Sequence, residues 1–417
     1  MPAERRPRLV VYTRVYPNRA QPGMGLFVRE RMRRVAEHLD LEVVAPVPWF
    51  PFQRLLGRLR PHSRAADVPL FEEQDGIRVH HPRFFCIPGL LKWTDGFFQA
   101  LGSLPLMRQL KQTFDYDVID AHFVYPDGVA ARWLCRWLNR PYTITLRGSL
   151  TRFEGQSAHR RQIDRALRDA AHVFSVADSL RQDAIAWGQG PNHVQVVGNG
   201  VDLQRFYPED RASSRARMGL PADSRLLVSV GGLTERKGFH RVIAVLPDLL
   251  RRHPDLHFAI AGGASPEGNN ESELRQQVAS LGLDDRVHFL GQVPPDELRH
   301  VYSAGDLFVL ATRFEGWANV FLEASACGLP IVTTRVGGNA EVVGSEKVGL
   351  LVPYGDGDAL REAIDQALAR DWDREAILAH ARANAWRARI PQLVAAFQAL
   401  HDGRTPAAVP APSSSES

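Results

Sequence analysis

Short runs of apolar, often β-branched residues alternate with longer amphipathic stretches along most of this chain. Twelve of the short runs have the length and composition of buried strands: residues 9–12, 41–45, 118–121, 142–146, 172–176, 194–197, 226–230, 257–261, 287–290, 307–311, 331–334 and 350–352. Between most of them lie stretches with helical periodicity, such as residues 27–39, 241–251, 272–281 and 360–369. Strands that alternate with helices form parallel sheets, and strands that are apolar throughout are covered on both faces. The sequence therefore predicts an α/β protein built from doubly wound parallel sheets.

The strand-like runs fall into two sets of roughly 180 residues, a usual size for one domain. A turn, Asn199-Gly200-Val201-Asp202, and the polar segment after it separate the sets. We expect an N-terminal domain over residues 1–198, a C-terminal domain over 199–372, a helix over 373–401 and a Pro-, Ala- and Ser-rich disordered tail over 402–417. Ligands bind at the carboxyl ends of such strands, so a cleft between two facing domains is the expected site.

Composition excludes several classes of protein. Three scattered cysteines (Cys86, Cys135 and Cys327) are too few for a disulfide framework or a thiolate metal site. No run approaches the roughly 20 apolar residues that cross a bilayer, and the first residues lack the apolar core of a signal peptide. We therefore expect a cytoplasmic protein.

The charge is distributed unevenly. Residues 1–195 contain 28 Lys and Arg against 19 Asp and Glu, whereas the rest contains 23 against 28. The basic half would attract anionic partners. Nucleic acid is not expected, because no nucleic-acid motif is present; an anionic membrane surface on the inner face of the cytoplasmic membrane is the other candidate.

One segment, residues 46–76, interrupts the alternation. It is rich in Pro, Arg and aromatic residues, with Trp49-Phe-Pro-Phe52 followed by Arg54-Leu-Leu-Gly-Arg-Leu-Arg60. We expect a loop or a short amphipathic helix here. Such a segment could be a surface excursion with a solvated basic face, or it could contact a membrane surface.

Two carboxylates, Glu315 and Glu323, flank a strand-to-helix turn with seven residues between them. Glu315 is expected in the loop and Glu323 about one turn into the helix, with Asn319 as the N-cap. Carboxylates accept hydrogen bonds from sugar hydroxyls, and the free N–H groups at a helix start suit a phosphate. The run therefore offers contacts for a sugar, a phosphate and a ribose, the parts of a nucleotide-sugar.

This pair resembles the paired-glutamate motif of retaining glycosyltransferases with the GT-B fold, in particular glycosyltransferase family 4 and its bacterial polysaccharide-biosynthesis members. Further motifs follow the family's order: residues 18–30, 120–128, 145–148, 228–238, 258–263, 289–293 and 334–341. The resemblance covers the chain from about Val10 to Phe397. It implies two Rossmann-like domains facing a central cleft, with the last helix returning to brace the first domain.

The resemblance also implies an activity. A hexosyltransferase of this family moves a sugar, with retention, from a nucleotide diphosphate sugar to a hydroxyl of a glycan or lipid-linked acceptor in cell-envelope or exopolysaccharide synthesis. By the same resemblance, Lys237 would neutralise the diphosphate, Glu315 would contact the 3- and 4-hydroxyls of the sugar, and Glu323 would contact the ribose. Many members have an arginine where this chain has Gly232, and Arg236 is the candidate to replace it.

In the first half, the resemblance places His122 near the reacting carbon and Arg147 where many members have a histidine. Each position has a purely structural alternative: His122 as a satisfied core histidine, Arg147 as a cleft-edge arginine paired with Asp127 or Glu154. The catalytic candidates are His122, Lys237 and Glu315. The donor-binding candidates are Gly23, Gly25, Arg147, Gly231, Gly232, Arg236, Lys237, Gly263, Val293, Glu315, Gly316, Trp317, Ala318, Asn319, Val320, Glu323, Gly337 and Gly338.

No cofactor or metal is expected. Asp115-Tyr-Asp117 and Asp356-Gly-Asp358 match the Asp-x-Asp pattern of metal-dependent sugar transferases. The first lies at the start of a strand, on the wrong edge of the sheet, and the second lies in a turn after the last strand. Two other functions stay open: a nucleotide-sugar epimerase or phosphorylase with the same architecture, and a catalytically inactive nucleotide-sugar-binding protein.

Overall fold

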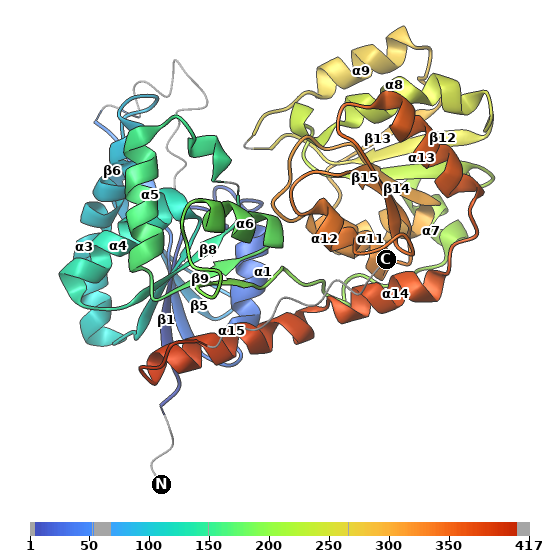
Figure 1. Cartoon of the computed structure of the whole chain (residues 1–417). Helices are drawn as coiled ribbons and strands as arrows, with labels where there is room; N and C mark the ends of the chain where they lie inside the picture. Colours follow the sequence, from blue (N-terminus) through green and yellow to red (C-terminus); the bar gives the residue numbers. More distant parts are fainter. Residues whose placement is uncertain (1–4, 52, 54–67, 149, 266, 407–417) are drawn as a thin grey trace. The chain divides into compact units, whose positions relative to one another are not determined.

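The computed structural model describes residues 5–51, 53, 68–148, 150–265 and 267–406. The chain divides into two compact units, which we call unit 1 (Met1–Gly198 with Arg389–Ser417) and unit 2 (Asn199–Ala388). Each unit is an α/β layer structure in which helices flank a twisted sheet (Figure 1). The amphipathic helix considered for residues 54–60 and the tail from residue 407 lie outside the described residues.

Within the described residues, the main sheet of unit 1 has eight strands and reverses its order next to β1. The order is β10 (Val194–Val196), β9 (His172–Ser175), β8 (Tyr142–Leu146), β7 (Val118–His122), β1 (Arg8–Tyr12), β2 (Asp40–Val44), β5 (Ile77–His80) and β4 (Phe71–Gln74). All neighbours pair in parallel except β4 and β5, which are antiparallel. A separate parallel pair joins β3 (Val47–Trp49) to β6 (Arg83–Phe85).

The expectation of a loop or short helix over residues 46–76 was therefore wrong at both ends of the segment, where β3 and β4 lie. The sequence did contain a signal for the β4–β5 hairpin. Asp75 and Gly76 have left-handed φ angles of 51° and 76°. An Asp-Gly pair with two positive φ angles is the favoured two-residue hairpin turn.

Helices cover both faces of the main sheet of unit 1 (Figure 1). They are α1 (Leu26–Val35), α3 (Asp95–Thr113), α4 (Val129–Leu138), α5 (Ser157–Asp169) and α6 (Asp178–Ala186), with the short helices η2 (Lys92–Thr94), η3 (Val124–Gly128) and η4 (Thr151–Phe153).

Unit 2 contains, within the described residues, a six-stranded parallel sheet. Its order is β13 (Val287–Gly291), β12 (Leu256–Ala261), β11 (Arg225–Val230), β14 (Leu307–Leu310), β15 (Ile331–Thr334) and β16 (Gly349–Val352). Its helices are α7 (Arg211–Met218), η5 (Glu235–Lys237), α8 (Phe239–Leu250), α9 (Glu271–Ser280), α10 (Leu298–Ala304), α11 (Asn319–Ala326), α12 (Asn339–Val343), α13 (Gly357–Ala369) and α14 (Arg374–Ala383).

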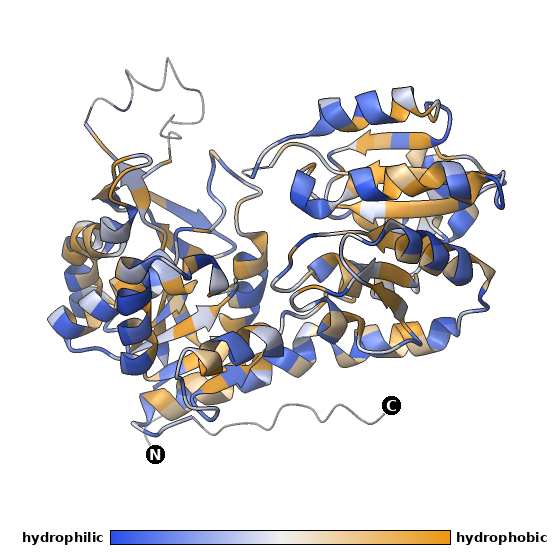
Figure 2. Ribbon diagram, turned by 45° about the horizontal axis from the view of Figure 1, so that its top comes forward, coloured by the Kyte–Doolittle hydropathy of each residue, from blue (hydrophilic) through white to orange (hydrophobic). Residues whose placement is uncertain are grey.

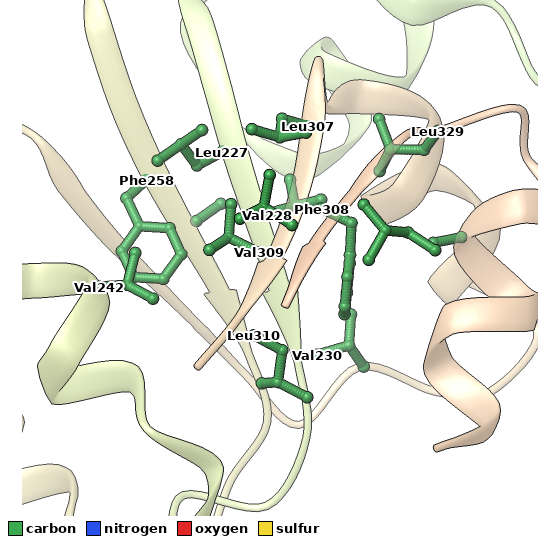
Figure 3. Packing of buried hydrophobic residues seen from close by; sticks show 14 of the residues in the cluster. Leu227, Val228, Val230, Val242, Phe258, Leu307, Phe308, Val309, Leu310 and Leu329 are labelled. Atoms are coloured by element: carbon green, nitrogen blue, oxygen red, sulfur yellow. The ribbon is translucent and has the colours of Figure 1, made fainter. Parts of the chain in front are cut away.

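The core of unit 2 explains why these apolar runs become strands. Val228, Phe258 and Phe308 are wholly buried, and they pack with leucines and valines of neighbouring strands (Figure 3). The strands of both units are coloured mainly as hydrophobic (Figure 2). Strands buried on both faces need apolar side chains at every position. All twelve predicted strands are present, and the doubly wound α/β class is confirmed.

The single helix expected over residues 373–401 is two helices, α14 (Arg374–Ala383) and α15 (Trp386–His401). The backbone between them pairs with Val201, whose N–H donates to Asn384 O and whose carbonyl accepts from Trp386 N–H. Gly200 permits this approach, because a Cβ there would lie 2.6 Å from Trp386 N. Within unit 1, the Phe397 ring of α15 lies 5.5 Å from the Phe174 ring.

None of the helices in the described part of the chain combines the length and the apolar content that crossing a membrane requires.

Candidate functional site

The sheet of unit 2 reverses its winding between β11 and β14, which are neighbours. The chain leaves these strands in opposite directions, and in open α/β sheets ligands bind at the carboxyl ends of strands at such a point. The two loops that follow these strands carry Lys237 and Glu315. The topology therefore brings the predicted amine and the first predicted carboxylate to the same place.

Lys237 and Glu315 are in direct contact. Lys237 Nζ donates to Glu315 Oε1 at 2.7 Å, and the same oxygen accepts from Arg236 at 2.9 Å and from the Thr312 hydroxyl at 3.2 Å. Glu315 is only 7% exposed. No described residue donates a hydrogen bond to its other oxygen, Oε2.

Arg236 is held from two sides. It donates to both carboxylate oxygens of Glu267, at 2.8 and 3.1 Å, and to the Phe314 carbonyl at 2.8 Å, in addition to Glu315. Burial lowers its pKa, but hydrogen bonds and charges from Glu267 and Glu315 outweigh burial, so the pKa is raised. Arg236 is thus a permanent cation in a fixed position beside Lys237.

The structure also explains why position 232 holds glycine instead of arginine. A Cβ at Gly232 would lie 2.8 Å from Ser265 Cβ, so a larger side chain would have to displace the loop after β12. At Gly231, a Cβ would lie 3.4 Å from Lys237 Cε, so the lysine stem runs over this glycine. The expectation that Arg236 rather than residue 232 supplies the second cation is consistent with this packing.

Gly337 and Gly338 hold the backbone of Glu315. Gly337 has a left-handed φ of 48°, and a Cβ there would lie 1.9 Å from the Glu315 carbonyl oxygen. Gly338 N–H donates to that same oxygen at 3.2 Å. Glycine at position 337 is therefore needed for the close approach of the two backbones, and the backbone N–H of residue 338 adds a hydrogen bond.

Helix α11 carries the second carboxylate. Glu323 accepts a hydrogen bond from the buried Tyr302 hydroxyl at 2.7 Å. The prediction that Asn319 is the N-cap was wrong: the N-cap is Ala318, which cannot cap with its side chain. Asn319 is the first helical residue, and its Oδ1 accepts from Asn199 at 3.1 Å.

The remaining donor-binding candidates of unit 2 lie in the same loops. The indole N–H of Trp317 is buried and has no acceptor among the described residues. The Gly263 carbonyl accepts from Leu233 N–H at 2.8 Å, which ties the end of β12 to the loop after β11. The others are placed as follows: Gly316 and Ala318 are buried, Val320 is half-buried in α11, and Val293 is half-buried after β13.

In unit 1, His122 belongs to a buried polar cluster at the end of β7. Its Nδ1 accepts from Arg147 Nε at 3.0 Å, and its Nε2 lies 3.1 Å from Asp120 Oδ2. Burial lowers the pKa of His122 to about 4, although Asp120 raises it. His122 is fully buried and Arg147 is 9% exposed, so Arg147 is the member of this cluster nearer to solvent.

The glycine loop after β1 is only partly explained by packing. Gly25 has a φ of 70°, and a Cβ there would lie 2.2 Å from the Val15 carbonyl oxygen, whereas a Cβ at Gly23 would meet nothing within 4 Å. Close packing thus requires glycine at 25 but leaves position 23 unexplained.

Sequence reasoning did not select four residues that contact the predicted ones: Asp120, Glu267, Tyr302 and Thr312. Asp120 had a signal, since residues two apart in a strand share a face and Asp120 therefore lies beside His122. Asp127, which the sequence analysis considered as a partner of Arg147, is a buried carboxylate that accepts from Gln99 at 2.9 Å and from Arg14 N–H at 3.2 Å. Burial raises its pKa to about 6.

The two Asp-x-Asp segments have structural partners. Asp115 pairs with Arg5 at 2.8 Å and Asp117 accepts from Arg8 N–H at 2.8 Å, while Asp356 caps α13 through Ala359 N–H at 2.9 Å. In the part of the chain that the structure describes, His, Cys, Asp and Glu side chains form no group of three that could hold a metal ion.

A pocket of about 510 Å³ lies elsewhere in unit 2. It is lined by Arg225, Asp306 and Pro330, at the amino ends of β11, β14 and β15. It is therefore on the opposite edge of the sheet from Lys237 and Glu315.

Comparison with known sequences identifies relatives over most of the chain. The profile described as "Glycosyl transferases group 1" matches residues 210–384, and "Glycosyltransferase Family 4" matches residues 62–205. TuaC of Bacillus subtilis (strain 168), a candidate teichuronic acid biosynthesis glycosyltransferase, is 30% identical over 86% of this chain and 88% of TuaC. The D-inositol 3-phosphate glycosyltransferase of Corynebacterium urealyticum is 31% identical over 81% of this chain and 84% of that protein.

Solved structures share the architecture. Sucrose-phosphate synthase from Thermosynechococcus elongatus has a TM-score of 0.76 at 22% identity, covering 96% of this chain and all of that chain. Anabaena HepE in complex with UDP has a TM-score of 0.71 at 21% identity, covering 94% of this chain and all of HepE. At such identities the likeness concerns the fold alone. The sequence matches and the fold agree, and the chain belongs to the glycosyltransferases of group 1 and family 4, which have the GT-B fold.

Proposed function

We propose that the protein is a retaining, metal-independent hexosyltransferase that uses a nucleotide diphosphate sugar. Its acceptor is a hydroxyl of a glycan or lipid-linked molecule, in the synthesis of a cell-envelope or extracellular polysaccharide. One observation carries the proposal. Lys237, Arg236 and Glu315 converge at the point where the sheet of unit 2 reverses, and the two cations donate to Glu315 Oε1 at 2.7 and 2.9 Å.

The two cations suit a diphosphate leaving group. Negative charge grows on the diphosphate as the bond to the sugar breaks, and fixed cations stabilise that charge. Both cations are balanced by carboxylates: Lys237 pairs with Glu315, and Arg236 pairs with Glu315 and Glu267. When the donor binds, Lys237 and Arg236 would contact both the protein carboxylates and the diphosphate. They would then stabilise the charge of the leaving group, a role that a metal ion has in other enzymes.

The two carboxylates would bind hydroxyl groups of the donor. Glu315 Oε2 would accept hydrogen bonds from sugar hydroxyls, while Oε1 stays held by its three donors. Glu323, oriented by Tyr302, would accept from the ribose hydroxyls. The incoming hydroxyl would attack the face that the diphosphate leaves, and a phosphate oxygen of the leaving group would take its proton.

In unit 1, His122 would act through Arg147. An arginine N–H can only donate, so His122 Nδ1 is the acceptor and the ring proton is on Nε2, facing Asp120. With a pKa of about 4 the imidazole is neutral at pH 7. Asp120 and His122 thus fix the position of Arg147, which would contact a phosphate of the donor or an anionic acceptor.

The names of the relatives suggest two classes of acceptor. TuaC is named for teichuronic acid biosynthesis, and several relatives are named for D-inositol 3-phosphate. A glycan acceptor and a polyol phosphate are therefore the first two acceptor classes to test. UDP-glucose, present in another structure of HepE, is a reasonable first donor.

The decisive experiment has two stages. Thermal-shift measurements with UDP-, GDP- and ADP-sugars should identify one donor that raises the unfolding temperature, because a ligand that binds only the folded state stabilises it. Incubation of that donor with a glycan or lipid-linked acceptor should then yield a product with the anomeric configuration of the donor, measured by NMR.

The other outcomes separate the alternatives. A converted free sugar without acceptor would indicate an epimerase, and dependence on inorganic phosphate would indicate a phosphorylase. Donor binding without turnover for any acceptor would favour an inactive binding protein. Inversion at the anomeric carbon would refute the retaining mechanism.

A further inference from the structure

Four large apolar side chains of unit 1 are exposed, three of them on one turn and the fourth on a strand tied to the chain just before that turn. Leu90 is 65% exposed, Leu91 55% and Trp93 48%. Trp49 of β3 is 47% exposed, and its carbonyl accepts from Cys86 N–H at 2.9 Å, just before the turn that carries the other three. We call residues 89–93 together with Trp49 the apolar knuckle. Single exposed apolar side chains are common, but a contiguous group marks an interaction surface.

The turn of the apolar knuckle is held in place by the surrounding structure. Leu91 has a φ of 47°, in the left-handed region that a bulky residue rarely adopts. Such strain persists only where the surrounding structure imposes it, and it is concentrated at functional sites. Here the Lys92 carbonyl accepts from the Tyr125 hydroxyl, and the Trp93 carbonyl accepts from Gln162 Nε2 at 2.9 Å. The backbone is therefore tied to the body of unit 1 while the side chains face solvent.

The surroundings of the knuckle are basic. Gln162 belongs to α5, where Arg160, Arg161 and Arg165 are exposed. Among the described residues, Arg161 and Arg165 have no carboxylate partner. Arg152 of η4 is also exposed, and its guanidinium lies 4.6 Å from the Phe153 ring. Exposed apolar side chains together with arginines that have no carboxylate partner are complementary to a surface with an apolar interior and anionic headgroups.

We infer that the apolar knuckle inserts into the interface of an anionic lipid bilayer. Trp49 and Trp93 would lie at the headgroup level, where indole rings are favoured, with Leu90 and Leu91 below them. The arginines of α5 would contact the phosphates of anionic lipids. A small apolar contact alone gives weak membrane binding, and a basic patch supplies the second attraction. The inference identifies the surface for the membrane partner expected from the charge distribution, and it does not depend on sugar transfer.

The test uses the full chain and sedimentation with vesicles. Wild-type protein should bind vesicles with about a third phosphatidylglycerol, bind neutral phosphatidylcholine vesicles much less, and lose binding as salt rises. The double variant Leu90→Asp/Leu91→Asp should lose at least about tenfold in apparent affinity, because it removes both inserted side chains and adds like charge. Arg161→Gln/Arg165→Gln should weaken binding to anionic vesicles only.

Matched controls isolate the surface. Leu281→Asp changes a leucine that is 40% exposed in unit 2, and it should leave vesicle binding unchanged. Circular dichroism and the thermal shift caused by the donor should be the same in Leu90→Asp/Leu91→Asp and in wild type. A wild type that binds vesicles but no nucleotide-sugar would count against the proposed function and leave this inference standing.

Three results would overturn the inference. The first is equal vesicle binding by wild type and Leu90→Asp/Leu91→Asp. The second is the absence of wild-type binding to anionic vesicles at low salt. The third is a wild-type dimer, measured by light scattering, that the same double variant converts to a monomer, because the knuckle would then be a contact between two copies of the chain.

Discussion

Glu315 shows how one carboxylate can be both fixed and available. Three donors converge on Oε1, from Lys237, Arg236 and Thr312, while Oε2 faces no protein donor among the described residues. Charge-assisted hydrogen bonds from two cations hold Oε1 strongly. They therefore fix the orientation of the whole carboxylate, including Oε2, before a ligand binds. The consequences can be tested one side chain at a time.

Replacing Lys237 by alanine should lower turnover by roughly 100-fold, the effect of losing one electrostatic donor to a developing charge. The measurement is kcat with the donor found by thermal shift. Lys347→Ala, which removes an exposed lysine of the same unit, is the matched control and should be neutral. Wild-type turnover in Lys237→Ala would remove this lysine from the mechanism.

Replacing Arg236 by glutamine should weaken binding of the nucleoside diphosphate by about tenfold or more, because one hydrogen bond to a charged group contributes about 1.5–3 kcal/mol. Isothermal titration of the diphosphate against wild type and variant measures this. The control is Arg313→Gln, an exposed arginine in the neighbouring loop after β14 that lies 4.0 Å from Glu235. If both variants bind equally, position 236 does not replace the missing cation.

Two buried histidines make stability depend on pH. Burial lowers the pKa of His122 and of His172 to about 4, below the 6.5 of an unfolded chain. Between these values the unfolded chain binds protons that the folded chain excludes, so the free energy of unfolding should increase as pH rises through this window. From pH 5 to 7 each histidine should contribute about 1–2 kcal/mol. Asp127, with a pKa raised to about 6, acts in the opposite direction.

His172→Gln separates these contributions, because His172 lies in β9 and pairs with Gln195 at 3.1 Å, outside the His122 cluster. Urea unfolding of wild type and variant at pH 5 and pH 7 gives the required free energies. The variant's stability should change less between the two pH values, by about 1–2 kcal/mol. The same change in both proteins would show that His172 does not titrate as inferred.

The elements of unit 2 also position Glu315 through backbone contacts. The loop before α12 approaches the loop after β14 so closely that Gly337 Cα faces the Glu315 carbonyl. Helix α11 begins at Asn319, four residues after Glu315, and has no side-chain cap. Within this helix, Glu323 accepts a hydrogen bond from the Tyr302 hydroxyl of α10. A change in one loop should therefore move a carboxylate in another.

Gly337→Ala should lower kcat/KM by at least about tenfold, because the new Cβ would collide with the Glu315 carbonyl and displace the carboxylate. Gly355→Ala is a closely matched control: its φ is 84°, also left-handed, but a Cβ there meets nothing within 4 Å. Both variants place alanine at a positive φ, so the difference between them reports the contact with Glu315 and not the backbone strain. Equal kcat/KM in the two variants would show that the contact with Glu315 is unimportant.

For the molecule as a whole, the proposed chemistry relies on fixed protein charges. Lys237 and Arg236 are the cations at the switch point of unit 2, and both Asp-x-Asp segments are engaged in ion pairs or helix capping. Transfer activity should therefore survive an excess of EDTA, with a rate within about twofold of the untreated enzyme. Complete loss of activity that added magnesium restores would contradict the metal-free mechanism.

Some features could be predicted because they depend on local pattern. Strands buried on both faces require apolar residues at each position, so all twelve strands were recognisable, and the spacing of Glu315 and Glu323 followed from a strand, a turn and a helix start. The strands between Val47 and Phe85 were missed, since short, half-exposed strands carry little apolar pattern and their pairing depends on distant partners.

The sequence by itself determined the α/β class, the two sets of strands and the family, because repeating apolar runs and ordered motifs are properties of the chain alone. The partners of individual side chains were decided only by the tertiary structure. Asn319 was predicted to cap a helix, but its side chain accepts a hydrogen bond from Asn199 instead. The His122 ring accepts a hydrogen bond from Arg147. The physical reason is that a hydrogen bond depends on which atoms meet within about 3 Å, and that is set by packing between segments far apart in sequence.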